Sequence, residues 1–310
     1  MKQDREPFHA GERGLQALAG AEQAIQRRGK ALIRDFMPEQ HRQFFAGLSY
    51  VFAATLDPQG YPQANLLTGT AGFMQSPDPR RLMIRHPEAV FAPGAFAPGD
   101  PVALLGIDLA NARRNRANGV FESEVGGNWK IRIEQSFGNC PQYIHRRSKP
   151  LVPLSPITIE ARALIASSTT FFIASRSPDV DSTQGGGLDI SHRGGPPGFV
   201  RWLDAHTLMF PDYPGNNFFN TLGNLSADAR TGLLFIDFQS GQTVRVSGRA
   251  EIVWGASASP AGPAAPNTRE LRIKVEAITP GRIAHGFQWL RSATAPQFAT
   301  ETTLSDLNRV

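Results

Sequence analysis

The chain has 310 residues, of which 41% are hydrophobic and 19% charged, a composition typical of one large or two medium-sized globular domains. A single cysteine, Cys140, excludes an intrachain disulfide and any metal site built on several thiolates. The formal net charge is +5 with dispersed basic residues, and no zinc-finger, helix-turn-helix or RNA-binding motif is present, so a small anionic ligand is favoured over a nucleic acid.

The N-terminus carries no targeting pattern. Residues 1–10 are polar and charged, unlike a signal peptide, and no apolar run approaches the ~18 residues that span a bilayer. We therefore expect a cytoplasmic protein without a membrane partner.

Residues 1–43 are predicted to form a helical extension. A second helix is expected to begin near Pro38 and to end at Gly47, and short β-rich segments follow from Ser49. Frequent glycine and proline, 30 and 24 residues, favour strands joined by turns over long helices. Within the extension, four residues lie at helical spacing: Leu15, Leu18, Glu22 and Ile25.

The sequence from Ser49 onwards contains an internal repeat. Five segments of the first half resemble five of the second in the same order, at an offset of roughly 120 to 140 residues. Any one match could reflect general β-strand composition, but the shared order favours duplication. We predict two β-barrels of about six strands, each preceded by a helix. The matched segments are 50–60 with 171–179, 81–84 with 207–210, 102–109 with 232–238, 116–120 with 245–249, and 130–134 with 272–276.

The repeat divides the chain into three parts: the extension at 1–43, a first barrel at 44–150 and a second at 151–310. Three prolines between residues 150 and 156 indicate a linker, and residues 255–266 indicate a surface loop before the last strand at 270–278. Inside the second barrel we expect a hairpin turn at 204–206, a short helix at 216–225 and a buried strand at 233–238.

Motifs for common catalytic machinery are missing from the sequence. There is no nucleophile elbow, zinc-protease helix, Walker loop or dinucleotide-binding glycine motif, and the 7 histidines show no ligand spacing. A catalytic metal is therefore not expected.

Two segments of the second half carry groups suited to a phosphate. Residues 189–200 place Ser191 and Arg193 at a strand end, and residues 210–225 supply amide and hydroxyl groups around a helix start. Helix N-terminal N–H groups with an arginine bind phosphate well. The alternative is that these residues only cap the helix and form a turn. The groups at the helix start are Asn216, Asn217, Asn220 and Thr221.

These segments read Ser-x-Arg-Gly-x-x-x-Gly-Phe-Val from Ser191 and Pro-Asp-x-x-Gly-Asn-Asn from Pro211. Both resemble the pyridoxamine 5′-phosphate oxidase superfamily of FMN-binding split barrels, in its predicted flavin-nucleotide-binding branch. The clear resemblance covers residues 165–253. Residues 44–144 resemble the same barrel more weakly and lack both segments, so the first barrel is predicted to be degenerate.

The resemblance implies a mainly β protein with flanking helices, whose two tandem split barrels form an intrachain pseudo-dimer with FMN in the groove between them. The chain would then be a monomer acting as its own dimer, or a homodimer. Arg193 and the pair Asn216 and Asn217 would hold the phosphate, with fewer basic residues than in the oxidase proper. The strand Phe210-Pro211-Asp212 would run along the isoalloxazine ring.

Residues 136–144, which follow the last strand of the first barrel, also resemble a recurrent element of this branch. We expect them to cross the groove near the ring, with Gln142 or Tyr143 bonding the ring edge and Cys140 beside it. The alternative for Cys140 is a buried, inert thiol.

The resulting functional hypothesis is an FMN-dependent oxidoreductase that passes hydride between the flavin and a nicotinamide or a small organic substrate. A flavin carries its own redox chemistry, so no catalytic triad is required. Two alternatives remain: a non-catalytic flavin-binding protein, and a haem-binding or haem-degrading protein with His192 or His145 as axial ligand. A deazaflavin cofactor is a further variant.

Overall fold

A computed structural model describes residues 6–91, 97–148, 160–178, 187–255, 268–283 and 290–298, with only the backbone described at 290–293. The linker predicted at 150–156 and most of the loop predicted at 255–266 lie outside these residues. None of the helices in the described ranges is long and apolar enough to cross a membrane.

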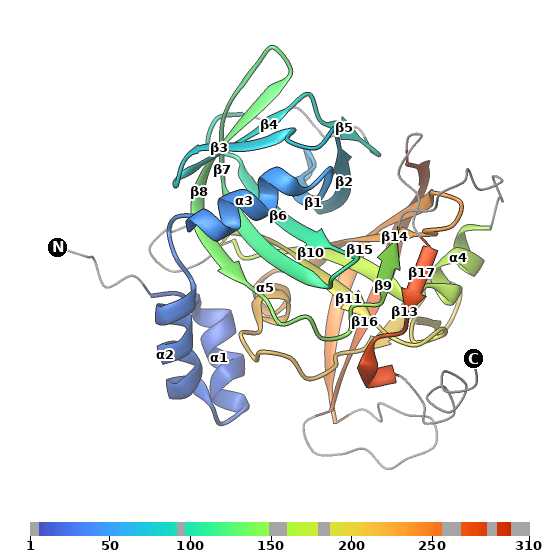
Figure 1. The fold of residues 1–310 in the computed structure, drawn as a ribbon. Helices are drawn as coiled ribbons and strands as arrows, with labels where there is room; N and C mark the ends of the chain where they lie inside the picture. Colours follow the sequence, from blue (N-terminus) through green and yellow to red (C-terminus); the bar gives the residue numbers. More distant parts are fainter. Residues whose placement is uncertain are drawn as a thin grey trace, which may run out of the picture.

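Three helices open the chain: α1 (Ala10–Leu18), α2 (Glu22–Leu32) and α3 (Glu39–Gly47). The α1 helix begins with a capping box, in which the His9 ring accepts from the backbone and Glu12 bonds the His9 backbone N–H. Gly20, with φ of +68°, separates α1 from α2. The two lie together at one end of the molecule, while α3 lies along the first sheet (Figure 1).

The first sheet has eight strands in the order β3-β4-β8-β7-β6-β1-β2-β5. Their bounds are β1 (Tyr50–Leu56), β2 (Pro62–Thr68), β3 (Met74–Asp78), β4 (Arg81–Arg85), β5 (Glu88–Ala89), β6 (Pro101–Asp108), β7 (Arg113–Val125) and β8 (Asn128–Gly138).

The second sheet has seven strands in the order β11-β10-β14-β15-β16-β13-β12. Helix α4 (Ala161–Ser167) precedes it, and α5 (Asn220–Ala227) lies between β13 and β14. The strands are β10 (Thr170–Arg176), β11 (Leu188–Gly194), β12 (Arg201–Trp202), β13 (Thr207–Pro211), β14 (Arg230–Ile236), β15 (Gln242–Trp254) and β16 (Arg269–Arg282).

A small third sheet joins β9 (Arg146–Ser148) to β17 (Leu290–Ala293), followed by a 3-10 turn, η1 (Pro296–Phe298). The strand predicted at 270–278 is therefore β16, and it is not the last, because β17 follows it. The predicted helix at 216–225 begins four residues later, at Asn220, because Asn217 and Phe219 adopt left-handed φ angles of 59° and 61°.

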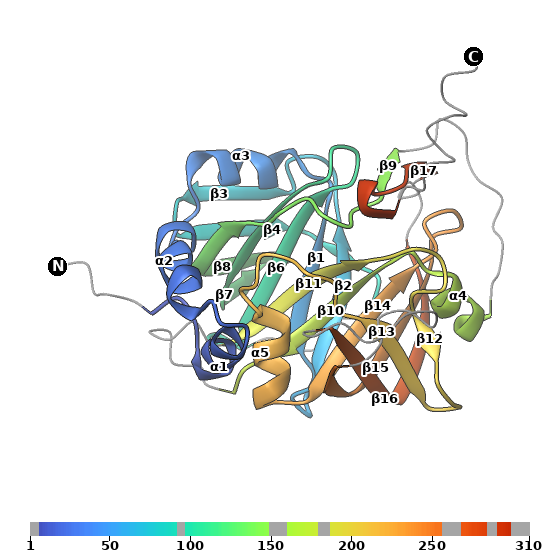
Figure 2. The ribbon, with the colours of Figure 1, turned by 90° about the horizontal axis from the view of Figure 1, so that it is seen from below.

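The two large sheets share one strand topology. When the first sheet is read from β3 and the second from β12, each strand of the second sheet corresponds to one strand of the first. All five matches predicted from the sequence fall on corresponding strands. Each sheet curls, and the two lie against each other with α5 at one side of the junction (Figures 1 and 2). The chain is thus two tandem split β-barrels that form an intrachain pseudo-dimer.

Glycines mark the same irregularity in both barrels. The register of β7 on β8 shifts before Gly119, and that of β15 on β16 shifts before Gly248. A Cβ at Gly119 would lie 1.9 Å from the Arg132 carbonyl oxygen, and one at Gly248 would lie 2.3 Å from that of Lys274. A side chain at either bulge would collide with the paired strand.

The ladder registers define which residues are equivalent. Phe52 pairs with Leu105 in the first sheet, and Phe172 pairs with Leu234 in the second. In four of the five predicted matches, the residues at the centre of the segments are the ones that this register makes equivalent. The match of β1 to β10 is off by one residue, since Phe52 corresponds to Phe172 and not to Ile173.

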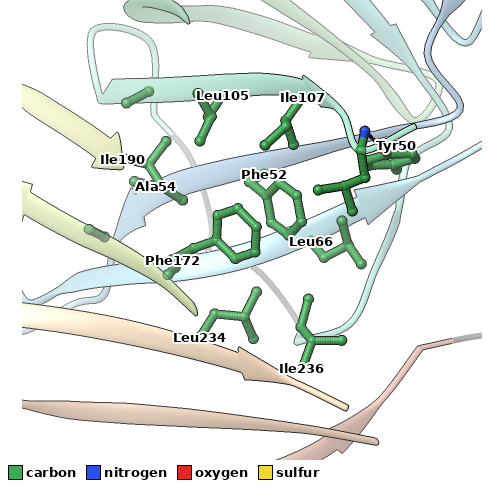
Figure 3. Packing of buried hydrophobic residues seen from close by; sticks show 14 of the residues in the cluster. Tyr50, Phe52, Ala54, Leu66, Leu105, Ile107, Phe172, Ile190, Leu234 and Ile236 are labelled. Atoms are coloured by element: carbon green, nitrogen blue, oxygen red, sulfur yellow. Dashed lines mark hydrogen bonds between the residues drawn. The ribbon is translucent and has the colours of Figure 1, made fainter. Parts of the chain in front are cut away.

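The barrels are joined by an apolar core. The Phe52 and Phe172 rings stack with centroids 3.4 Å apart and an interplanar angle of 14°. Both rings are fully buried and lie among aliphatic side chains from both sheets, including Leu66 and Leu234 (Figure 3). Equivalent residues therefore meet at the pseudo-twofold axis, and hydrophobic burial holds the two halves together.

Candidate functional site

A cavity of about 120 Å³ lies between the barrels and is lined by residues of both. The first barrel supplies Arg114 and Arg116 from β7, together with the segment that follows β8. The second supplies β11, the end of β13 and the start of α5.

A buried polar network built around Arg116 forms the floor of the cavity. One Arg116 amino group donates to Asp189 Oδ1 at 2.7 Å and to Asn220 Oδ1 at 3.1 Å, and the other donates to Ser191 Oγ at 2.5 Å. Thr221 Oγ1 bonds Ser191 Oγ at 2.9 Å. These bonds are internal, so the Ser191, Thr221 and Asn220 side chains fix the floor. An arginine of the first barrel thereby positions two elements of the second, β11 and α5.

Helix α1 extends this network from the N-terminal extension. Asn220 Nδ2 donates to Glu12 Oε1 at 2.5 Å, and the His9 backbone N–H donates to Glu12 Oε2 at 2.9 Å. Burial raises the pKa of Glu12 to about 8, with a further increase from Asp189, against the opposing hydrogen bonds from His9 and Asn220 and the charge of Arg116. At neutral pH Glu12 is therefore largely protonated.

Two glycines allow α1 to approach α5 this closely. A Cβ at Gly11 would lie 2.4 Å from the Gly223 carbonyl oxygen, and one at Gly223 would lie 2.5 Å from Glu12 Cγ. The helices therefore touch at their backbones.

A second charged cluster lies at the end of β13. The Asp212 carboxylate accepts from Arg193 at 2.7 Å and from Arg269 Nε at 2.9 Å. The Arg269 guanidinium also lies 5.0 Å from the Phe219 ring centroid. The Asp212 carboxylate thus holds Arg193 and Arg269 together.

Arg114 differs from these arginines because, within the described residues, its guanidinium has no carboxylate or hydrogen-bond partner, and its Nε is buried. Burial and the nearby Arg116 and Arg193 lower the pKa of Arg114 to about 9. It remains cationic at neutral pH, and an unpaired, half-buried cation favours binding of an anion.

The N-terminus of α5 also opens into the cavity. Its N-cap residue, Phe219, provides no side-chain cap, and the Asn216 side chain instead accepts from the Phe218 N–H at 3.1 Å. Gly215, Asn216 and Asn217 line the cavity beside this end. Uncapped N–H groups at a helix N-terminus form a site for an anion.

Aromatic side chains form one wall. Tyr143 and Tyr213, one from each half, line the cavity and stack with centroids 5.3 Å apart. Phe298 packs against both, at 5.6 and 5.4 Å. The Tyr143 hydroxyl donates to the Pro214 carbonyl at 2.7 Å, so the segment after β8 is tied to the loop before α5.

The two histidines near the cavity differ. His145 accepts from Ala295 N–H at 3.1 Å through Nδ1 and bonds the Gly195 carbonyl at 2.9 Å through Nε2. His192 lines the cavity, is 7% exposed, and neither ring nitrogen has a partner among the described residues. Burial and the nearby Arg114 and other basic groups hold the pKa of His192 well below its ordinary value, so its ring is neutral.

Unpartnered buried atoms concentrate at this cavity. They include the Nε atoms of Arg114, Arg116 and Arg193, the Asn139 Oδ1 and both His192 nitrogens. Because buried polar atoms normally have partners, their grouping fits a polar ligand that supplies the missing bonds.

Most side chains predicted for the site do line the cavity: Ser191, Arg193, Pro211, Asp212, Asn216, Asn217, Asn220, Thr221, Cys140 and Gln142. Phe210 does not. It is fully buried in the second barrel, 4.8 Å from the Phe171 ring, because neighbouring strand residues face opposite sides. The alternative of a buried Cys140 is wrong, because the thiol is exposed at the cavity.

Four residues at the site were not predicted from the sequence: Arg114, Arg116, Arg269 and Glu12. For Arg116 a signal existed, since it begins a repeated segment and lies in a basic cluster. Within the described ranges, no group of three or more His, Cys, Asp and Glu side chains is placed to hold a metal ion.

The fold and cavity define a tandem split barrel with an arginine-lined cavity between its halves. Residues 157–280 match the family model described as pyridoxamine 5′-phosphate oxidase. The second barrel is therefore similar to the pyridoxamine 5′-phosphate oxidase family over these residues. The comparison with curated proteins found no match.

Several solved structures resemble the chain at low identity. HupZ of Group A Streptococcus is 21% identical over 45% of this chain and 98% of its own, with a TM-score of 0.29. General Stress Protein 26 of Bacillus anthracis is 13% identical over 42% and 95%, also at 0.29. A FAD-binding protein of Mesorhizobium loti is 14% identical over 40% and 93%, again at 0.29. These three likenesses carry no argument about function.

Proposed function

We propose that the cavity binds FMN and that the chain is a flavin-dependent oxidoreductase. The observation that carries the proposal is the unpaired Arg114 guanidinium, which shares one cavity with the uncapped start of α5. The similarity of residues 157–280 to the pyridoxamine 5′-phosphate oxidase family supports a flavin as the ligand.

The charges of the site suit a phosphate monoester. Arg114, Arg116, Arg193 and Arg269 line the cavity, and two carboxylates, Asp189 and Asp212, pair with three of them. The surplus is positive, and it complements a dianion. The phosphate would bind the N–H groups at the start of α5, with Asn216, Asn217, Arg193 and Arg114 around it.

The flavin ring would lie between the polar floor and the tyrosine wall. Gln142 and the edge strand β11 offer hydrogen-bonding groups there, because β11 has a strand neighbour on one side only within its sheet. Bound FMN would supply hydride transfer with a nicotinamide or a small organic substrate. The protein would bind and orient the ring, and the neutral His192 would contribute one donor and one acceptor.

The test is the visible spectrum of the freshly purified protein, with the released chromophore identified by mass and reduction then followed with NADH and NADPH. Arg114→Ala should weaken FMN binding about 10- to 100-fold, the usual effect of losing a charged hydrogen bond. Arg113→Ala is the matched control, because this neighbouring side chain is exposed and packs on Phe44. A colourless protein that takes up no FMN would refute the proposal, while tight FMN without turnover would favour the non-catalytic alternative.

A second candidate is haem binding, and the partnerless nitrogens of His192 support it. His145 is a poor axial ligand, because both of its ring nitrogens already have partners. Titration with haem should give a Soret band that disappears in His192→Ala if this candidate holds.

A further inference from the structure

The pseudo-twofold axis generates a second position equivalent to the cavity floor. The strand registers give each floor residue a counterpart in the opposite barrel. These counterparts lie on the other side of the barrel junction. There β2 contacts β14, just as the equivalent strands β11 and β6 are in contact at the cavity. The equivalent pairs are Asp189 and Gln63, Ser191 and Asn65, Arg116 and Arg245, and Asn118 and Ser247.

One polar contact of the floor is preserved at the second position. Asn118 Nδ2 donates to Asp189 Oδ1 at 3.3 Å, and the equivalent pair, Gln63 Nε2 and Ser247 Oγ, is 3.5 Å apart. The same two strand positions therefore touch at both places, with donor and acceptor exchanged.

Phe91 fills the second position. The Asn65 side chain bonds both backbone groups of this residue, donating to the Phe91 carbonyl at 2.5 Å and accepting from its N–H at 3.1 Å. The Arg245 guanidinium carbon lies 4.4 Å from the Phe91 ring centroid, where its equivalent, Arg116, bonds a carboxylate instead. A Cβ at Gly281 would lie 2.7 Å from the ring, so that glycine makes room for it. The ring is 7% exposed.

The cations of the cavity are also missing there. The residue equivalent to Arg114 is Thr243, and the residue equivalent to Arg193 is Leu67. Between β4 and β6 the described residues contain only the short strand β5, whereas the corresponding connection of the second barrel contains α5. The described residues of this connection thus supply no helix N-terminus, and neither equivalent position supplies an arginine.

We infer that the second position is a vestigial ligand site closed by Phe91 and Asn65, so that one chain binds one FMN where a symmetric pair of barrels would bind two. This inference rests on the proposed function, since it counts the flavin proposed for the first site. Two changes account for the loss: an aromatic ring occupies the space, and uncharged residues stand at the positions equivalent to Arg114 and Arg193.

The first measurement is the molar ratio of released FMN to chain after saturation with excess FMN and removal of the unbound ligand. The expected ratio is one. A ratio of two would overturn the inference and leave the proposed function standing. A ratio of zero would refute the proposed function, and the inference would fail with it.

The equivalent arginines provide a matched pair of variants. Arg116→Lys should weaken FMN binding at least tenfold, since lysine cannot reproduce the bonds to Asp189, Ser191 and Asn220 together. Arg245→Lys and Arg245→Ala should bind FMN as the unchanged protein does. Thermal unfolding of each variant separates loss of binding from loss of fold. Equal weakening by the changes at Arg116 and Arg245 would overturn the inference.

Discussion

The guanidinium of Arg116 and the carboxylate of Asp189 lie 2.7 Å apart across the junction of the two barrels, with both side chains almost fully buried. Removing one partner leaves the other charge buried without compensation, at a cost of about 3–5 kcal/mol. We expect Arg116→Ala to lower the free energy of unfolding by this amount and to abolish FMN binding, as measured by urea denaturation and flavin fluorescence.

Asp189→Asn tests the same pair from the other side. It keeps the shape and one acceptor for Arg116 but removes the charge, so it should destabilise the protein less than Arg116→Ala. If Arg116→Ala unfolds at the same urea concentration as the unchanged protein, the pair does not join the barrels in solution.

The α1 helix contains two glycines with opposite surroundings. Gly11 faces the Gly223 carbonyl, whereas a Cβ at Gly14 would meet nothing within 4 Å. Gly11→Ala should therefore destabilise the protein by about 1–3 kcal/mol through overpacking. Gly14→Ala should stabilise it by up to about 1 kcal/mol, because alanine is the better helix former. Thermal or urea unfolding of the two variants measures the contrast, and similar values for both would show that α1 does not dock on α5.

Glu12 should make stability depend on pH. Its pKa rises from 4.5 to about 8 on folding, so the folded chain binds the proton more tightly than the unfolded chain. The contribution of Glu12 to the free energy of unfolding is complete below pH 4.5. It falls by about 1.4 kcal/mol per pH unit above that value and is lost as the pH rises through 8. Glu12→Gln should remove this component, so that its stability relative to the unchanged protein improves between pH 5 and about pH 9.

Urea denaturation at several pH values across that window measures this dependence. Glu22→Gln serves as the control, because Glu22 is exposed in the first turn of α2. The prediction fails if the stability difference between Glu12→Gln and the unchanged protein is constant with pH.

The fold was largely predictable because the chain contains the same barrel twice. Equivalent strands keep similar apolar patterns, so the order of the five matches was sufficient to give the topology. The match of β1 to β10 was off by one residue because both strands are buried on both faces. A continuous apolar run does not define the register of a strand.

The site was predictable on one side only. The second barrel carries Arg193 and the Asn216 segment in contiguous motifs, and these do line the cavity. Arg116 and Glu12 reach the same site from residues far away in sequence, through pairings 73 and 208 positions apart. Such contacts depend on how the two barrels and α1 pack, which no local pattern specifies.

Cys140 gives a direct test of where the flavin binds. Its thiol is exposed, lines the cavity near Arg114, and is the single cysteine of the chain, so its labelling reports on this site alone. We expect a maleimide to react readily with the protein freed of flavin and at least tenfold more slowly after saturation with FMN, because the ligand would cover the thiol. Riboflavin, which lacks the phosphate, should protect only at much higher concentration if Arg114 and the start of α5 hold that group. Labelling at the same rate with and without bound FMN would place the flavin elsewhere.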